Sequence, residues 1–235
     1  MVDHFDFDVI LRSLGPLLRD GLTFTLKLTA LATVGGTVFG TVLAVLRLRG
    51  PGVIGRVAAL YVNGMRSLPL VLVIFWFFFL APYVGQWILH AERPIPVGVF
   101  ASSILTFTLF EAAYFSEIVR AGIQSIPRGQ AAAAEAVGLS PTQVMRYVVL
   151  PQAFRNMLPV MLTQAIVLFQ DTSLVYVVSA PDLLGVASQV AHRDGRLVEM
   201  YLFVAAVYFV ISLVASSVVR QLQARTALVR PGSPT

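Results

Sequence analysis

Four charged residues stand inside otherwise apolar stretches of the chain: Arg66, Glu111, Glu117 and Asp171. An ionised side chain in hydrocarbon is costly unless it pairs with an opposite charge or faces water. Such residues therefore indicate either a pathway for a charged solute or internal ion pairs. The polar run Asp171-Thr172-Ser173 adds a second signal, because it can open a helix toward a cavity where irregular backbone is tolerated.

Three of these four charges have two interpretations each. Arg66 either attracts a substrate carboxylate or forms a buried pair with Asp171, and a structural or gating role for Asp171 is favoured because an anion avoids a carboxylate. Glu117 either pairs with Arg120, three residues later, or caps the polar segment that follows. Glu111 is too deep to be surface charge. The candidate residues of a translocation path are Arg66, Pro69, Glu111, Asp171, Thr172 and Ser173.

The elements that carry these residues are membrane-spanning helices, since the chain is 57% hydrophobic and only 12% charged. A helical span needs about 20 mainly apolar residues. Within the first span, Gly36 and Gly40 form a GxxxG pattern, which indicates close helix packing inside the chain or a dimer interface. The predicted fold is all-α with five spans: Leu22–Leu46, Val57–Leu80, Val97–Ala113, Leu158–Val178 and Tyr201–Val219.

The distribution of arginines predicts the orientation of these spans. With the N-terminus outside, most arginines fall in the inner loops and the tail, as the positive-inside rule requires. The net charge of +5 is then a topology signal and does not indicate nucleic acid. Asp3, Asp6 and Asp8 stand where a secretory signal would be basic, so the first span is expected to be retained. The expected divisions are an extracytoplasmic segment 1–21 with a helix around Val9–Leu18, a transmembrane domain 22–221 and a cytoplasmic tail 222–235.

Several kinds of site are missing from the sequence. Lys27 is the only lysine and has no glycine-rich loop before it, so the chain has no Walker A motif. There is no cysteine, and His4, His90 and His192 are isolated in segments predicted to lie outside, so no metal site is expected. Any energy for transport must therefore come from a partner or from an ion gradient.

A polar segment, residues 121–152, separates the third and fourth spans on the predicted cytoplasmic side. Pro127 begins a short alanine-rich helix and Gly138 suits the left-handed residue that ends it. Ser140–Gln143 reads as a capping box that starts a second helix, and Pro151 is expected to end that helix. Two helices held at a fixed angle suit a docking surface that transmits force, although an ordinary helical loop gives the same pattern.

The same segment resembles the EAA loop of binding-protein-dependent ABC importer permeases, through GQ-AAAEAVG-L followed by VVLPQAF. Arg66–Leu70 (RSLPL) resembles the R-G-T-P-L-L of the polar amino-acid branch, and Ala113–Gly122 resembles its A-Y-x-x-E-x-x-R-x-G. Gln170–Leu174 (QDTSL) is similar to its K-D-T-S-L. The stretches LFEAAYFSEI and VLFQDTSLVYV are most similar to glutamate/aspartate importer permeases.

This resemblance implies a type I ABC importer (MetI-like) transmembrane domain in the bacterial inner membrane. The chain would be a permease subunit, not an enzyme, of an ATP-driven importer for amino acids, with glutamate or aspartate expected. The implied partners are a second permease (as a heterodimer or a homodimer), two copies of a cytoplasmic ABC ATPase, an extracytoplasmic amino-acid-binding protein and membrane lipid, with no nucleic acid. This chain would bind no cofactor, since ATP and Mg would sit on the ATPase.

One position departs from the family pattern. The glutamate of the EAA triplet aligns with Ala132, and Glu135 lies three residues later. A heteromeric transporter would retain the missing glutamate in its sister permease. The resemblance assigns ATPase coupling to Gly129, Ala132, Ala133, Ala134, Glu135, Gly138 and Pro151. Two alternatives stay open: an ion-coupled secondary carrier or channel with Asp171 and Glu117 as ion sites, and a membrane anchor that recruits an ATPase without transport.

Overall fold

The structure is a computed structural model that describes residues 5–226, and every regular element in that range is a helix. The first four residues, His4 among them, and residues 227–235 of the expected tail lie outside the described range. The α-helices are α1 (Phe7–Pro16), α2 (Thr23–Arg49), α3 (Gly52–Arg66), α4 (Leu70–Leu89), α5 (Val99–Gln124), α6 (Arg128–Ala136), α7 (Pro141–Gln143), α8 (Leu150–Asp171), α9 (Leu183–Asp194) and α10 (Leu197–Thr226).

Three shorter segments of other helix types join these elements. A π-helical segment, Leu17–Leu22, connects α1 to α2, and another, Val144–Val149, connects α7 to α8. A 3₁₀ segment, Thr172–Val178, follows α8. The chain is therefore helical without a break from Phe7 to Arg49, so the helix expected around Val9–Leu18 runs directly into the first span.

Among the described residues, the structure contains five helical stretches that are long and apolar enough to span a membrane, as many as were predicted. Their bounds are Phe7–Arg49, Leu70–Leu89, Val99–Gln124, Pro141–Val178 and Leu197–Ala224. The prediction of Val57–Leu80 as the second span was wrong, because that stretch contains α3, a turn at Ser67–Pro69 and the start of α4. Pro69 has no N–H and disfavours a helical conformation at the residue before it, so the helix ends there and α4 forms the span.

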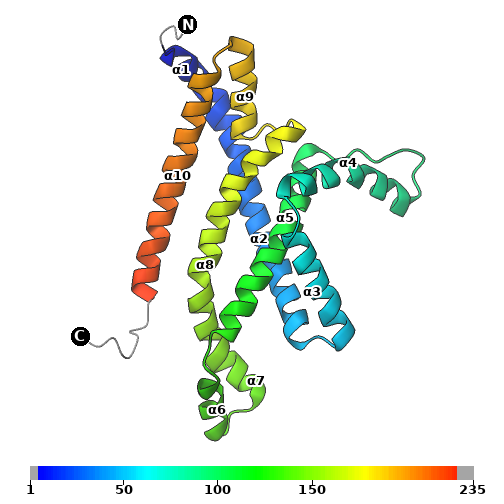
Figure 1. Cartoon of the computed structure of the whole chain (residues 1–235), viewed down its shortest axis with the longest axis vertical. Helices are drawn as coiled ribbons and strands as arrows, with labels where there is room; N and C mark the ends of the chain where they lie inside the picture. The colour runs from blue at the N-terminus through cyan, green and yellow to red at the C-terminus, as the bar shows by residue number, and fades with distance from the viewer. Residues whose placement is uncertain (1–4, 227–235) are drawn as a thin grey trace.

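Helices α2, α5 and α8 lie at the centre of the bundle, with α10 alongside α8 and α4 projecting away from it (Figure 1). Helices α6 and α7 lie at one end of the molecule, and α1 and α9 lie at the other. The closest packing is between α2 and α5, where a Cβ on Gly40 would stand 2.7 Å from Cβ of Phe115 and 2.8 Å from the carbonyl oxygen of Ala112. A Cβ on Gly36 would stand 3.0 Å from Cβ of Glu111. The GxxxG pattern therefore serves packing within the chain, the first of its two interpretations.

Helix α9 lies between the fourth and fifth predicted spans, in a segment for which no helix was predicted. The side chain of Asp182 accepts hydrogen bonds from the backbone N–H groups of Leu184 and Gly185, both at 3.0 Å, and so caps its first turn. Gly195, at φ +67, ends the helix. The apolar face of α9 is buried against α1 and α10. Asp182 and Gly195 are ordinary start and stop signals that would have predicted this helix.

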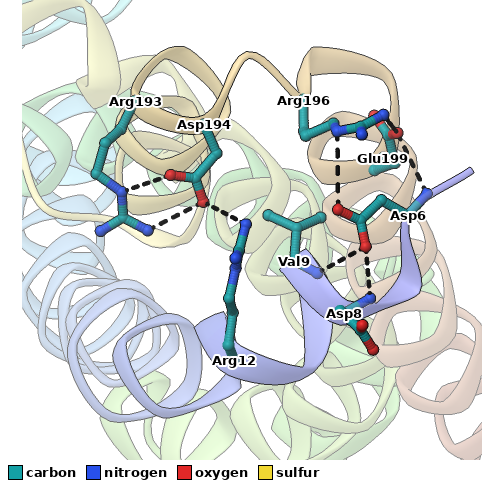
Figure 2. Close-up of polar contacts among 8 residues, drawn as sticks. All are labelled: Asp6, Asp8, Val9, Arg12, Arg193, Asp194, Arg196 and Glu199. Atoms are coloured by element: carbon teal, nitrogen blue, oxygen red, sulfur yellow. Dashed lines mark hydrogen bonds and ion pairs between the residues drawn. The ribbon is translucent and has the colours of Figure 1, made fainter. Parts of the chain in front are cut away.

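Ion pairs tie α1 to the connection between α9 and α10 (Figure 2). Asp194 accepts hydrogen bonds from Arg193 Nε at 2.8 Å and from Arg12 Nη2 at 3.2 Å. Arg196 lies 3.7 Å from the Asp6 carboxylate and donates to Glu199 at 3.3 Å. This end of the bundle is therefore held together by ion pairs between the N-terminal residues Asp6 and Arg12 and the connection from α9 to α10.

Candidate functional site

Up to residue 143, the polar segment 121–152 folds as its proline and glycine positions predicted. Helix α6 begins after Pro127, and Gly138 adopts φ +92 two residues beyond its end. The N–H of Gly138 donates to the carbonyl of Glu135 at 2.9 Å, and the N–H of Leu139 donates to the carbonyl of Ala134 at 3.2 Å. These bonds satisfy carbonyls that the end of the helix leaves free, so Gly138 is a true terminator.

The predicted capping box at the start of α7 is also confirmed. The N–H of Ser140 donates to Oε1 of Gln143 at 2.9 Å, and the N–H of Gln143 donates back to Oγ of Ser140 at 3.4 Å. The prediction that Pro151 ends this second helix was wrong, because the chain stays helical from Pro141 through α8. Pro151 is the second residue of α8, directly after a π-helical segment in which the regular α-helical hydrogen-bond pattern is already interrupted.

A small apolar core holds α6 against the neighbouring helices. Ala134 of α6 is buried with Val144 and Val149 of the π-helical segment, and Ile123 and Ile126 from the end of α5 pack on them. Ala132, Ala133 and Glu135 are exposed, and so are Gly129 and Pro151. One face of α6 is thus fixed to the membrane helices, while the other is free to contact a partner.

The ends of α5 and α8 beside this core are joined directly. Asn156 Nδ2 of α8 donates to Oγ of Ser125 at 2.9 Å, and Ser125 in turn donates to the carbonyl of Gly122 at 2.7 Å. Gly122 lies so close to α8 that a Cβ on it would stand 2.9 Å from Cβ of Met157. The end of α5 is therefore fixed to α8 directly beside α6.

Farther from α6 along α5, one carboxylate faces three guanidinium groups that come from three helices. We name this group the Glu117 cluster; it consists of Arg47, Arg66, Glu117 and Arg120. Glu117 accepts hydrogen bonds from Arg47 Nη1 of α2 at 2.5 Å and from Arg120 Nη2 at 2.6 Å. Arg66 Nη1 of α3 lies 3.7 Å from the same carboxylate. The predicted pairing of Glu117 with Arg120 is confirmed, whereas its pairing with Arg47 joins residues 70 positions apart and was not predicted.

Arg66 is the least constrained member of the cluster. Its side chain is 41% exposed, against 14% for Arg47, and its guanidinium lies 5.6 Å from the ring centre of Tyr114. The pair with Asp171 considered from the sequence does not form among the described residues, since the ionic partner of Arg66 is Glu117. Arg66 and Pro69 bracket the turn between α3 and α4, so the cation sits where two helices meet.

The two remaining intramembrane acids lie deeper. Glu111 is fully buried, and Gln164 Nε2 of α8 donates to its Oε2 at 3.0 Å, while its Oε1 has no hydrogen-bond partner in the described part of the chain. Asp171 is half-buried at the last turn of α8, where the helix changes to 3₁₀ geometry and Thr172 Oγ1 donates to the carbonyl of Phe169 at 2.6 Å. The helix does not open at Asp171–Ser173 but narrows there. The structure does not gather Arg66, Glu111 and Asp171 into one ion-paired site.

Comparison with known proteins identifies the family. The family model described as "Binding-protein-dependent transport system inner membrane component" matches residues 36–228. The chain is 51% identical over 224 residues to the glutamate/aspartate import permease protein GltK of Escherichia coli O6:H1, covering 95% of this chain and 99% of that protein. It is 35% identical to the probable glutamine ABC transporter permease protein GlnP of Bacillus subtilis, over 88% of this chain and 93% of the relative.

Solved structures agree with this result. The crystal structure of an amino acid ABC transporter with histidines matches with a TM-score of 0.85 and 29% identity, covering 95% of this chain and all of that one. An inward-facing conformation of the MetNI methionine ABC transporter matches at 0.70 and 21% identity, which speaks to the fold alone. The fold is therefore that of a MetI-like type I importer. This chain belongs to the binding-protein-dependent transport system inner membrane components, as a membrane-embedded permease subunit and not an enzyme.

Proposed function

We propose that the chain imports acidic amino acids, glutamate or aspartate, across the inner membrane. The observation that carries this proposal is the 51% identity over nearly the full length of a glutamate/aspartate import permease. The Glu117 cluster supports it chemically, because three guanidinium groups face a single carboxylate there. A site with surplus positive charge near the end of the spans attracts a solute that carries net negative charge.

The proposed assembly contains this chain, a second permease, two copies of an ATPase and an extracytoplasmic binding protein. The second permease is related but not identical, because Ala132 leaves this chain without the glutamate that the EAA loop usually provides. The N-terminus lies outside, which puts α6 on the cytoplasmic side beside the ATPase. The transmembrane domain comprises residues 22–221, with segment 1–21 outside and the tail 222–235 inside. ATP and Mg bind to the ATPase, and this chain binds no cofactor.

Coupling proceeds through the exposed face of α6. Gly129, Ala132, Ala133 and Glu135 present that face, while Ala134 anchors the helix in its apolar core and Gly138 keeps it short. Closure of the ATPase pair pushes α6, and the Ser125–Asn156 contact passes this displacement to α5 and α8. In energetic terms, ATP binding favours one packing of the spans over another. Pro151, in the first turn of α8, lies on this route.

Arg66 is the proposed partner of a substrate carboxylate, because it is exposed and held only weakly by Glu117. Glu111, Asp171, Thr172 and Ser173, with Pro69 at the start of α4, shape the path and its gating without forming ion pairs with the substrate. The secondary-carrier and membrane-anchor alternatives have no observation in their favour.

The test compares ATP hydrolysis of the reconstituted complex in the presence of the binding protein loaded with glutamate, aspartate or glutamine. Glutamate and aspartate should stimulate hydrolysis and glutamine should not. The Arg66→Gln variant should lose at least about tenfold in transport efficiency for glutamate, because a charge-assisted hydrogen bond is lost. Arg56→Gln, on the same helix at an exposed position, is the matched control and should behave as the wild type. Equal stimulation by all three amino acids would contradict the proposed specificity.

A further inference from the structure

A groove of about 300 Å³ lies between the ends of α2 and α5, the π-helical segment Val144–Val149 and the start of α8, and no residue of the Glu117 cluster lines it. Its lining is apolar except for one cation at the end of α2. The lining residues are Val45, Leu48, Arg49, Ile123, Met145 and Leu150. The proposed transport function uses none of these side chains.

The cation at this groove has no partner in the described part of the chain. Arg49 is exposed and makes no ion pair or hydrogen bond among the residues that the structure describes. Arg47, two residues earlier, differs from Arg49, because its guanidinium forms an ion pair with Glu117 and is largely buried. Arg49 is therefore a free charge-assisted donor at the mouth of an apolar groove.

An exposed apolar stripe leads along α2 into the groove. Val34, Val38, Val42 and Val45 recur every three or four residues and so share one face of the helix, and they are 47–65% exposed. Arg49 follows four residues later on the same face. This face lies away from Gly36 and Gly40, which pack on α5, so it is directed to the surroundings of the bundle.

We propose that the stripe and the groove bind an anionic phospholipid, with an acyl chain along the valines and the headgroup phosphate on Arg49. The arrangement of these side chains matches a phospholipid. A long apolar surface runs along the span and suits an acyl chain, and a single cation at the end of the span suits the headgroup phosphate. Arginine binds phosphate bidentately, and basic pockets between spans are suited to lipid headgroups. A protein helix on this face would have to supply an acidic group at the same depth. The proposal does not depend on the transported substrate.

The test uses the complex purified with its partner subunits and equilibrated with vesicles of phosphatidylcholine that contain phosphatidylglycerol. Native mass spectrometry then measures the lipid retained per complex. Arg49→Gln should weaken retention of phosphatidylglycerol at least about tenfold. Arg56→Gln is the matched control, since it removes the same charge from an exposed arginine on the next helix, outside the groove. It should retain lipid as the wild type does.

A second variant tests the binding site of the acyl chain separately from that of the phosphate. Val45→Trp fills the groove and leaves Arg49 in place, and it should also lose retention. Both substituted positions are exposed, so the complex should purify in normal yield. Equal lipid retention by the two arginine variants, or equal retention of phosphatidylcholine, would overturn the proposal. So would a cysteine at position 49 that cross-links to the second permease while retention of phosphatidylglycerol stays unchanged.

Discussion

Replacing Gly138 with alanine should loosen α6 without disturbing any side-chain packing. A Cβ at this position would have no heavy atom within 4 Å, so the whole cost comes from the backbone at φ +92. An L-residue in left-handed conformation costs about 1–2 kcal/mol. A change of that size raises the population of the locally opened state about 5–30-fold. The bonds that break are those from the N–H groups of Gly138 and Leu139 to the last turn of α6.

Amide hydrogen exchange of the assembled complex, read by mass spectrometry on a peptide that covers the end of α6, measures this opening directly. Exchange at Leu139 should accelerate about 5–30-fold in Gly138→Ala. Gly129→Ala is the matched control, because Gly129 is also exposed and has no neighbour within 4 Å, but lies within α6 at ordinary helical φ. It should leave exchange unchanged or slow it, since alanine favours a helix. Equal acceleration in both variants would refute the argument from backbone strain.

Three other changes test different parts of the molecule. Ala132→Glu restores the missing glutamate at an exposed position, so the ATPase should still co-purify, and loss of the ATPase would contradict the coupling assignment. Gly40→Val forces a Cβ to 2.7 Å from Phe115 and should lower stability by at least about 1–3 kcal/mol, seen as a lower melting temperature of the purified chain. The hydrogen bond and charge of Arg193 hold the pKa of Asp194 below its usual range, so the stability it contributes is present above the ordinary carboxyl pKa and is lost as pH falls through the lowered value. The difference in melting temperature between wild type and Asp194→Asn should therefore shrink on acidification, and a difference that grows would contradict this.

The sequence predicted those parts of the fold whose signals are local. Gly138 and the Ser140–Gln143 box end and begin helices through bonds to residues three to five positions away, and both predictions are confirmed. Pro151 misled because a proline in the first turn of a helix and a proline after its end give the same local pattern. The opposite error occurred at Pro69, since the mainly apolar composition of Val57–Leu80 concealed the turn between α3 and α4.

The Glu117 cluster shows what local signals do not contain. Arg120 is one helical turn away and its pairing was predictable, whereas Arg47 and Arg66 arrive from other helices. The close approach of α2 to α5 at Gly36 and Gly40 brings Arg47 beside Glu117, while Arg66 reaches the same carboxylate from the end of α3. The GxxxG pattern predicted close packing but not its partner helix. The roles of these charges in transport stay predictions for the experiments above.

We propose that this permease works as part of an ATP-driven importer of acidic amino acids. The most direct test is uptake of radiolabelled glutamate into proteoliposomes that carry the complete complex, with binding protein outside and ATP inside. Uptake should require both ATP and the binding protein, persist when ion gradients are collapsed, and be competed by aspartate but not by lysine. Uptake by this chain alone, driven by an ion gradient without ATP, would contradict the account.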